Sequence, residues 1–108
     1  MAHTTDHESV SIYQFTDEEI DTLMTNSYEC VLMWGTKDGW PVGVTQSFVW
    51  HEGKIWLTFT AQRHRAAAIR RDNRVSVNVS SRGYPDNASP DLPTGALTFK
   101  GRGEFFED

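Results

Sequence analysis

Hydrophobic and polar residues alternate along much of the chain after residue 28, and this pattern predicts short strands. Apolar positions recur at about every second residue in segments 28–36, 40–51 and 54–60, which places one side of each strand in a core. The links between these segments contain Gly39 and Gly53, each directly after an acidic residue, and such links are typical of hairpins. We therefore expect the three segments to form an antiparallel meander.

A helix is predicted before these strands. Thr16 followed three residues later by Glu19 has the pattern of a capping box. Ile20, Leu23 and Met24 then form one apolar stripe at helical spacing. We expect this helix to cover an opening of the core.

The second half of the chain is predicted to continue with a helix, a strand, a loop and a last strand. Segment 62–72 contains three consecutive alanines, which favour a short helix. Valines alternate with polar residues in 75–80, whereas proline and glycine are frequent in 81–95 and predict a long loop. Segment 97–105 alternates again, and the chain then stops without a closing element. A C-terminally truncated fragment is therefore an alternative to a complete domain.

The number and spacing of these elements predict the fold class. Five or more short strands with two small helices indicate a mostly β protein of the α+β kind, an antiparallel β-barrel with short helices capping the barrel. A chain of 108 residues suits one domain. Residues 1–12 are polar and have no regular period, so we expect a flexible leader followed by a single domain over 13–108.

Charge and composition exclude several classes of protein. The net charge of −5 argues against binding to nucleic acid or to an acidic membrane, because both need a basic surface. The N-terminal residues lack the pattern of a signal peptide, and no apolar run is long enough to cross a membrane. The single Cys30 lies in an apolar run, where we expect a small buried hydrophobe. These features predict a cytoplasmic protein.

The basic residues Arg63, His64 and Arg65 stand where the second helix is expected to begin. Cations in a first helical turn oppose the helix dipole by about 0.3 to 1 kcal/mol each. A bound phosphate would remove this conflict, because backbone N–H groups, the dipole and the basic side chains would all face one anion. The alternative is a solvated basic helix whose cations pair with surface carboxylates.

Gly43 and Gln46 interrupt a strand that is otherwise rich in β-branched and aromatic residues. Glycine in a strand marks either a bulge or a close approach of a ligand, and a glutamine there can hydrogen-bond a planar heterocycle or simply face solvent. The four histidines share no metal-ligand spacing with each other or with Cys30, so we expect no metal site.

Four motifs stand in an order that resembles a known family. They are Asp38-Gly39-Trp40-Pro41, His51-Glu52-Gly53-Lys54-Ile55-Trp56, Arg63-His64-Arg65-Ala66 and Arg71-Asp72-Asn73-Arg74-Val75-Ser76. Their order is similar to that of the pyridoxamine 5'-phosphate oxidase-like split β-barrel family, whose members hold FMN or the deazaflavin coenzyme F-420. The resemblance implies that the barrel is of the split kind.

The resemblance also implies a set of cofactor-binding residues. A basic pair after the third strand binds the cofactor phosphate in the family, and Arg63, His64 and Arg65 occupy that place, with either arginine matching depending on the alignment anchor. The sequence lacks the arginine that begins the ring-contacting strand of the oxidase itself, which argues against vitamin B6 oxidation. The implied contacts to the ring and nearby groups are Val44, Thr45, Gln46, Ser47, Thr58, Thr60 and Lys100.

The function implied by the resemblance is hydride transfer between FMN, or alternatively F-420, and a small-molecule substrate. The cofactor carries the chemistry, so no catalytic residue is expected in the protein. The resemblance further implies a homodimer with the cofactor at the interface. Two alternatives stay open: a non-catalytic flavin-binding or storage protein, which needs the same phosphate site, and a small nucleic-acid-binding barrel, which fits the local but not the net charge.

Overall fold

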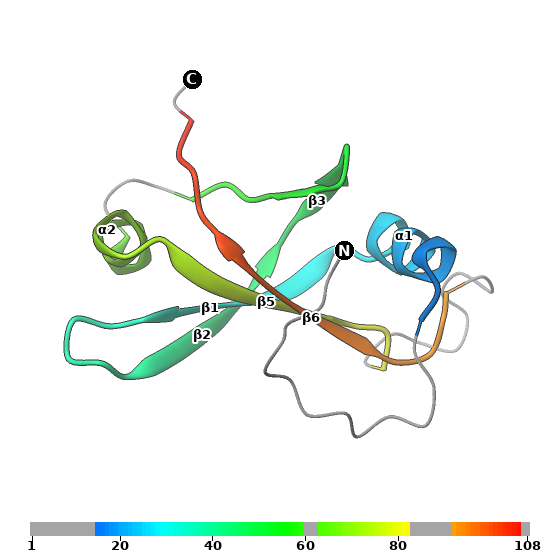
Figure 1. The fold of residues 1–108 in the computed structure, drawn as a ribbon, viewed down its shortest axis with the longest axis horizontal. Helices are drawn as coiled ribbons and strands as arrows, with labels where there is room; N and C mark the ends of the chain where they lie inside the picture. The colour runs from blue at the N-terminus through cyan, green and yellow to red at the C-terminus, as the bar shows by residue number, and fades with distance from the viewer. Residues whose placement is uncertain (1–14, 60–62, 83–91, 107–108) are drawn as a thin grey trace.

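Two antiparallel sheets and two short helices make up the fold (Figure 1). The computed structural model describes residues 15–59, 63–82 and 92–106. The larger sheet has the strand order β2-β1-β5-β6, and β3 pairs with β4 in a second sheet. The elements are α1 (Asp17–Asn26), β1 (Glu29–Gly35), β2 (Pro41–Ser47), β3 (Val49–His51), β4 (Lys54–Trp56), α2 (His64–Arg71), β5 (Arg74–Ser80) and β6 (Ala96–Arg102).

The architecture confirms the predicted fold class. It is mostly antiparallel sheet with two short helices, which is consistent with a split β-barrel, and the two sheets do not join into a closed barrel. Figure 1 shows α1 and α2 at opposite ends of the larger sheet. Each helix therefore packs against a different part of the protein.

The predicted strand 40–51 is in fact two strands, so the prediction of one continuous strand was wrong. In the pairing of β1 with β2, Ser47 lies opposite Glu29, the first residue of β1. The pairing of β1 with β2 ends at these two residues. The chain leaves the larger sheet at the buried Phe48, whose N–H donates to the carbonyl of Tyr28 (3.1 Å), and β3 pairs with β4 instead. The expected meander is thus divided between two sheets.

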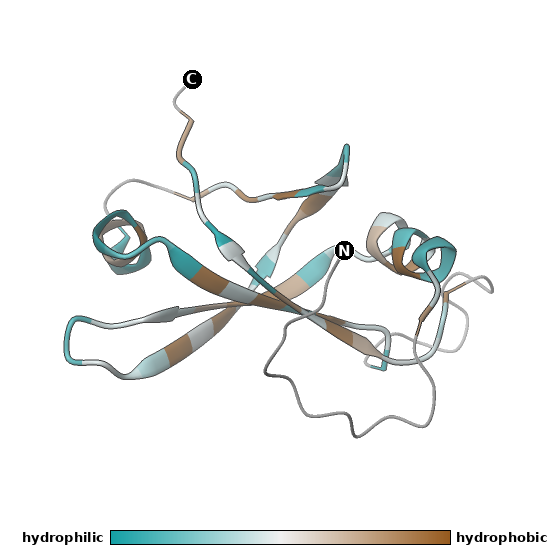
Figure 2. Ribbon diagram, viewed as in Figure 1, coloured by the Kyte–Doolittle hydropathy of each residue, from teal (hydrophilic) through white to brown (hydrophobic). Residues whose placement is uncertain are grey.

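The core lies on one face of the larger sheet. Val77 and Val79 of β5 and Leu32 of β1 are buried, and hydrophobic and polar positions alternate along β5 in Figure 2. Cys30 belongs to the same buried cluster, and burial raises the pKa of its thiol to about 11. The expectation that Cys30 is a buried hydrophobe is therefore confirmed.

Helix α1 begins as the sequence predicts. The Thr16 hydroxyl accepts from the N–H of Glu19 (3.1 Å), and the Glu19 carboxylate accepts from the N–H of Thr16 (2.8 Å). Leu23 and Met24 are buried. The indole of Trp50 in β3 donates to the Asp21 carboxylate (3.0 Å), which joins the helix to the smaller sheet.

Helix α2 packs against the segment that follows β6. Ile69 is buried, and a Cβ placed on Gly103 would lie 2.9 Å from its Cγ2 atom. The N–H of Gly103 donates to the carbonyl of Asn73 (2.8 Å). Glycine is needed here because the backbone approaches the helix too closely for a side chain.

Candidate functional site

The first turn of α2 lacks the acidic residues that usually stabilise a helix start. Arg63 is the N-cap and makes no side-chain capping bond, and the turn contains no acidic residue. By contrast, the first turn of α1 carries three acidic residues. We call Arg63, His64 and Arg65 the basic turn. Its charges oppose the helix dipole, as the sequence predicts.

The basic turn retains hydrogen-bond donors. The N–H of Ala66 already donates to the Arg63 carbonyl (3.0 Å), whereas no described residue accepts from the N–H groups of His64 and Arg65. The side chains of Arg63 and His64 form no hydrogen bond or ion pair with any described residue. The alternative of a helix start neutralised by surface carboxylates therefore has no support in the described ranges.

Arg65 is oriented by an aromatic neighbour. Its guanidinium carbon lies 5.1 Å from the centroid of the Phe59 ring, within the range of a cation–π interaction. Its Nε atom is buried and has no hydrogen-bond partner among the described residues. A buried donor without an acceptor costs free energy, so an acceptor brought by a ligand would be favourable at this atom.

Gln46 connects β2 to the segment that leads toward the basic turn. Its Nε2 atom donates to the carbonyl of Thr58 (2.9 Å), the residue before Phe59. Its Oε1 atom is buried and, within residues 15–59, 63–82 and 92–106, has no partner. Gln46 and Arg65 thus present an unpaired acceptor and an unpaired donor beside the same stretch, 58–59.

The other predicted ring-contacting residues are divided between the two faces of the larger sheet. Val44 and Gln46 lie on the face of β2 that is partly buried, while Thr45 and Ser47 are exposed on the opposite face. Lys100 is also exposed and is paired with Ser76 in the ladder of β5 and β6. Thr60 lies outside the described residues.

The space above Gly43 is occupied by the protein itself. Gly43 lies opposite Met33 in a regular ladder, which shows no bulge at this position. A Cβ on Gly43 would lie 3.0 Å from Cγ of Met33 and 3.2 Å from Cγ1 of Val31. The glycine therefore accommodates side chains of β1.

The sequence analysis missed the aromatic support of the basic turn. Phe59 packs edge to face with Phe105, with ring centroids 6.3 Å apart, and the Arg70 guanidinium carbon lies 4.2 Å from the Phe105 centroid. The alternation of apolar residues in 54–60 hinted at Phe59, but no local signal places the distant Phe105 beside it. This contact becomes visible only when the segment after β6 is placed next to α2.

The donors of the basic turn fit a phosphate group. Anions are favoured at a helix start. The start of α2 presents two backbone N–H groups that have no acceptor among the described residues, together with the buried Arg65 Nε and the exposed side chains of Arg63 and His64. Among the described residues no cluster of His, Cys, Asp and Glu is placed to hold a metal ion. The same part of the chain contains no helix with the length and apolar character that a membrane span needs.

Solved structures share this arrangement of strands. The conserved hypothetical protein Rv2991 from Mycobacterium tuberculosis has a TM-score of 0.69 and 23% identity over 89% of this chain. An F-420 reductase has a TM-score of 0.55 and 14% identity over 76% of this chain and 90% of its own. A heme binding protein from Mycobacterium smegmatis has a TM-score of 0.69 and 19% identity over 91% of this chain. The chain has the fold of these proteins.

Because the sequence identities to these three proteins are low, the comparison shows a shared fold alone. The chain spans 56% of the length of the Mycobacterium tuberculosis protein and 39% of that of the heme binding protein. No protein-family model matches the sequence, and no curated protein sequence matches it either.

Proposed function

We propose that the protein binds a flavin-type cofactor through its phosphate, at the basic turn, and belongs to the pyridoxamine 5'-phosphate oxidase-like split β-barrel family. The observation that carries the proposal is the helix start itself, where basic side chains replace acidic ones and the buried Arg65 Nε lacks an acceptor. A phosphate supplies the missing acceptor and offsets the charge that opposes the dipole.

Two groups of residues would hold the cofactor. Arg63, His64 and Arg65 would bind the phosphate, and Gln46 would present its unpaired Oε1 to a ring N–H near the Thr58 carbonyl. The exposed Thr45, Ser47 and Lys100 lie on the other face of the sheet. A ring held at Gln46 is therefore not expected to contact those three residues within one chain.

The cofactor is FMN or F-420. The F-420 reductase among the proteins of this fold supports the deazaflavin, whereas the sequence resemblance covers both cofactors. A bound flavin or deazaflavin supplies the hydride donor and acceptor, so the chain's own task is to place the ring and to bind its phosphate. We expect the reaction to be hydride transfer to or from a small-molecule substrate.

Titration of purified protein with FMN and with F-420, followed by absorbance and fluorescence, tests the proposal. We expect saturable binding of one of the two, with one cofactor per chain at saturation. Failure of both to bind at millimolar concentration would contradict the proposal. Reduction of the bound cofactor followed by reoxidation with candidate substrates then separates an oxidoreductase from a storage protein, because the storage protein shows no substrate-dependent turnover.

A homodimer is part of the same proposal. Trp40, Tyr28 and Phe106 are 70%, 60% and 71% exposed, and large exposed aromatic side chains in a small domain favour an interface. A second copy would also be able to bring the opposite sheet face, with Thr45 and Ser47, to a cofactor bound by its partner.

A further inference from the structure

Two aromatic rings connect the basic turn to the segment that follows β6. The Phe59 ring lies 5.1 Å from the guanidinium carbon of Arg65, and it meets the Phe105 ring edge to face, at 88° and 6.3 Å between centroids. The guanidinium carbon of Arg70 lies 4.2 Å from the Phe105 centroid. The four side chains form one continuous row of contacts, in the order Arg65, Phe59, Phe105 and Arg70. We call it the aromatic row.

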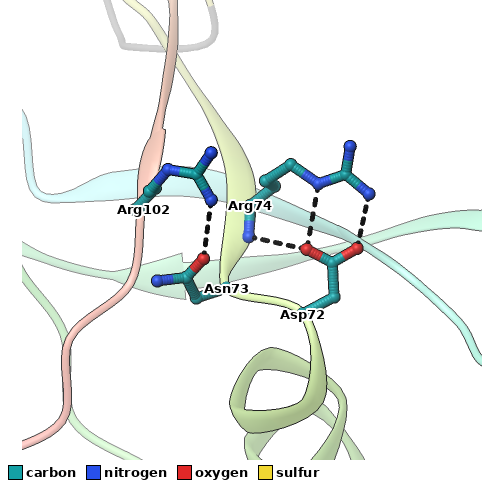
Figure 3. A network of polar contacts seen from close by, with 4 residues as sticks. All are labelled: Asp72, Asn73, Arg74 and Arg102. Carbon is teal, nitrogen blue, oxygen red and sulfur yellow. Dashed lines mark hydrogen bonds and ion pairs between the residues drawn. The ribbon is translucent and has the colours of Figure 1, made fainter.

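Hydrogen bonds close to each ring fix the position of the aromatic row. The Gln46 side chain donates to the carbonyl of Thr58 (2.9 Å), the residue before the first ring. The N–H of Gly103, two residues before the second ring, donates to the Asn73 carbonyl (2.8 Å), and Asn73 Nδ2 donates to the Gly103 carbonyl (3.4 Å). The Asn73 side chain is itself fixed by a bond from Arg102 Nη1 (3.0 Å), as Figure 3 shows. The row is thus anchored to β2 on one side and to the link between α2 and β5 on the other.

Contact with a ring orients an arginine without using its hydrogen bonds. The N–H donors of a guanidinium lie in the plane of the group, and a cation–π contact occupies none of them. The Nε atom of Arg65 is buried and has no acceptor within the described ranges, so this donor stays available for an anion. An arginine that is already oriented also loses less conformational freedom on binding than a mobile one does.

The three members of the basic turn differ in this support. Arg65 is half-buried, whereas Arg63 and His64 are exposed. Neither exposed side chain contacts an aromatic ring of the described residues. The sequence leaves either arginine as the match to the family's basic pair, but the packing distinguishes them and favours Arg65.

We propose that Arg65 contributes most of the phosphate binding at the basic turn and that Phe59 and Phe105 are the positioning residues that hold it. This inference rests on the proposed function, because it takes the basic turn as the phosphate site. Phe59 orients the Arg65 guanidinium, and Phe105 supports Phe59 from a segment distant in the chain. Both rings act on the anion through Arg65, whereas the exposed Arg63 adds charge without being held.

The side-chain Nε–H resonance of Arg65 in an NMR spectrum reports both the ring contact and the anion. In the empty protein, the Phe59 ring should move the Arg65 Hε resonance away from that of Arg71, an exposed arginine of the same helix. The probe is inorganic phosphate at constant ionic strength, because it tests the anion site without a cofactor ring. We expect phosphate to shift the Arg65 resonance saturably and to leave that of Arg71 nearly unchanged.

A pair of substitutions at Phe59 separates the ring from its bulk. Phe59→Leu removes the ring and keeps an apolar side chain, whereas Phe59→Tyr keeps the ring. The leucine variant should lose the displaced Arg65 resonance and bind phosphate about two- to tenfold more weakly, and the tyrosine variant should retain both. The matched control is Trp56→Leu, because Trp56 lies in the same segment and contacts Phe106 instead of an arginine. Both readouts should keep their wild-type values in this control.

The two arginines are compared by the same titration. Arg65→Gln should weaken phosphate binding about tenfold or more, since a charge-assisted bond is lost, and Arg63→Gln about threefold or less, since an exposed cation contributes little. The control is Lys54→Gln, because Lys54 is an exposed cation on β4. Equal losses at the two arginines, or wild-type affinity in Phe59→Leu, would overturn this inference and leave the phosphate site in place.

The remaining outcomes separate this inference from the proposed function. Binding of inorganic phosphate at Arg65 without binding of FMN or F-420 would contradict the proposed cofactor and keep the positioning role. Absence of any phosphate response at Arg65 in wild type would overturn both. Phe59 packs partly against the core, so Phe105→Leu, at a ring that is 38% exposed, replaces Phe59→Leu if that variant melts much earlier than wild type. It should change both readouts in the same direction, and unchanged values would overturn the inference.

Discussion

Gly103 is a residue whose replacement should damage the packing of α2. A methyl group there would lie 2.9 Å from Cγ2 of the buried Ile69, and a β-branched side chain on a helix has little freedom to move aside. We expect Gly103→Ala to destabilise the protein by about 1 to 3 kcal/mol. Urea unfolding followed by tryptophan fluorescence measures this difference.

The control for Gly103 is a glycine two residues earlier. A methyl group on Gly101 would meet no atom within 4 Å, so Gly101→Ala should leave the unfolding midpoint nearly unchanged. A loss of stability at Gly101 equal to that at Gly103 would show that the loss does not come from the contact with Ile69.

Asp72 gives a pH dependence whose sign follows from its pKa. Hydrogen bonds from Arg74 lower the pKa of this carboxyl from 3.8 to about 2. Because the folded-state value lies below the unfolded one, Asp72 contributes stability above pH 3.8 that is lost as the pH falls toward 2. We expect Asp72→Asn to lower the melting temperature at neutral pH and to change it little near pH 2. The exposed Glu104, changed to Gln, is the control, and an equal effect of Asp72→Asn at both pH values would contradict the assignment.

At the scale of elements, the capping box of α1 can be tested alone. Thr16→Ala removes the hydroxyl that accepts from Glu19 N–H and should cost about 0.5 to 2 kcal/mol of stability. Thr16→Ser keeps the acceptor and should cost much less. Chemical unfolding of the two variants measures both values, and a serine variant as unstable as the alanine variant would show that the hydroxyl is not responsible.

Local sequence signals predicted the elements well and their partners poorly. The capping box, the three alanines of α2 and the alternating valines of β5 each involve neighbours in the chain, so the sequence reveals them. The break at Phe48 depends on where β1 begins, which is a fact about another segment. The position of β1 between β2 and β5 likewise depends on a strand far along the chain, so local sequence signals do not reveal it.

The candidate site was predictable only in part, for the same reason. The basic turn appears in the sequence because three basic residues precede an alanine run. The contact of Arg65 with Phe59 and the bond from Gln46 to Thr58 depend on where residues 58 and 59 lie relative to β2 and α2. Thr45 and Gln46 lie on opposite faces of β2 because side chains alternate along a strand. The family resemblance implied that both residues contact the ring, without regard to this alternation.

For the whole molecule, the exposed aromatic side chains predict self-association. We expect light scattering at micromolar concentration to give twice the chain mass, with the cofactor present. Trp40 is 70% exposed, and we expect Trp40→Gln to shift the equilibrium toward monomer. A monomer in wild type under these conditions would contradict the dimer.

The central claim is that the basic turn binds the phosphate of the cofactor. The most direct measurement compares the affinities of FMN and riboflavin, which differ in the phosphate, for wild type, for Arg63→Gln with Arg65→Gln, and for the Lys54→Gln control. The deazaflavin F-420 and its chromophore without the phosphate-bearing tail form the equivalent pair. We expect wild type and control to prefer the phosphate-bearing ligand on the order of a hundredfold, and the double variant to lose most of that preference while its empty form melts no earlier. A preference that survives in the double variant would place the phosphate elsewhere and contradict the account.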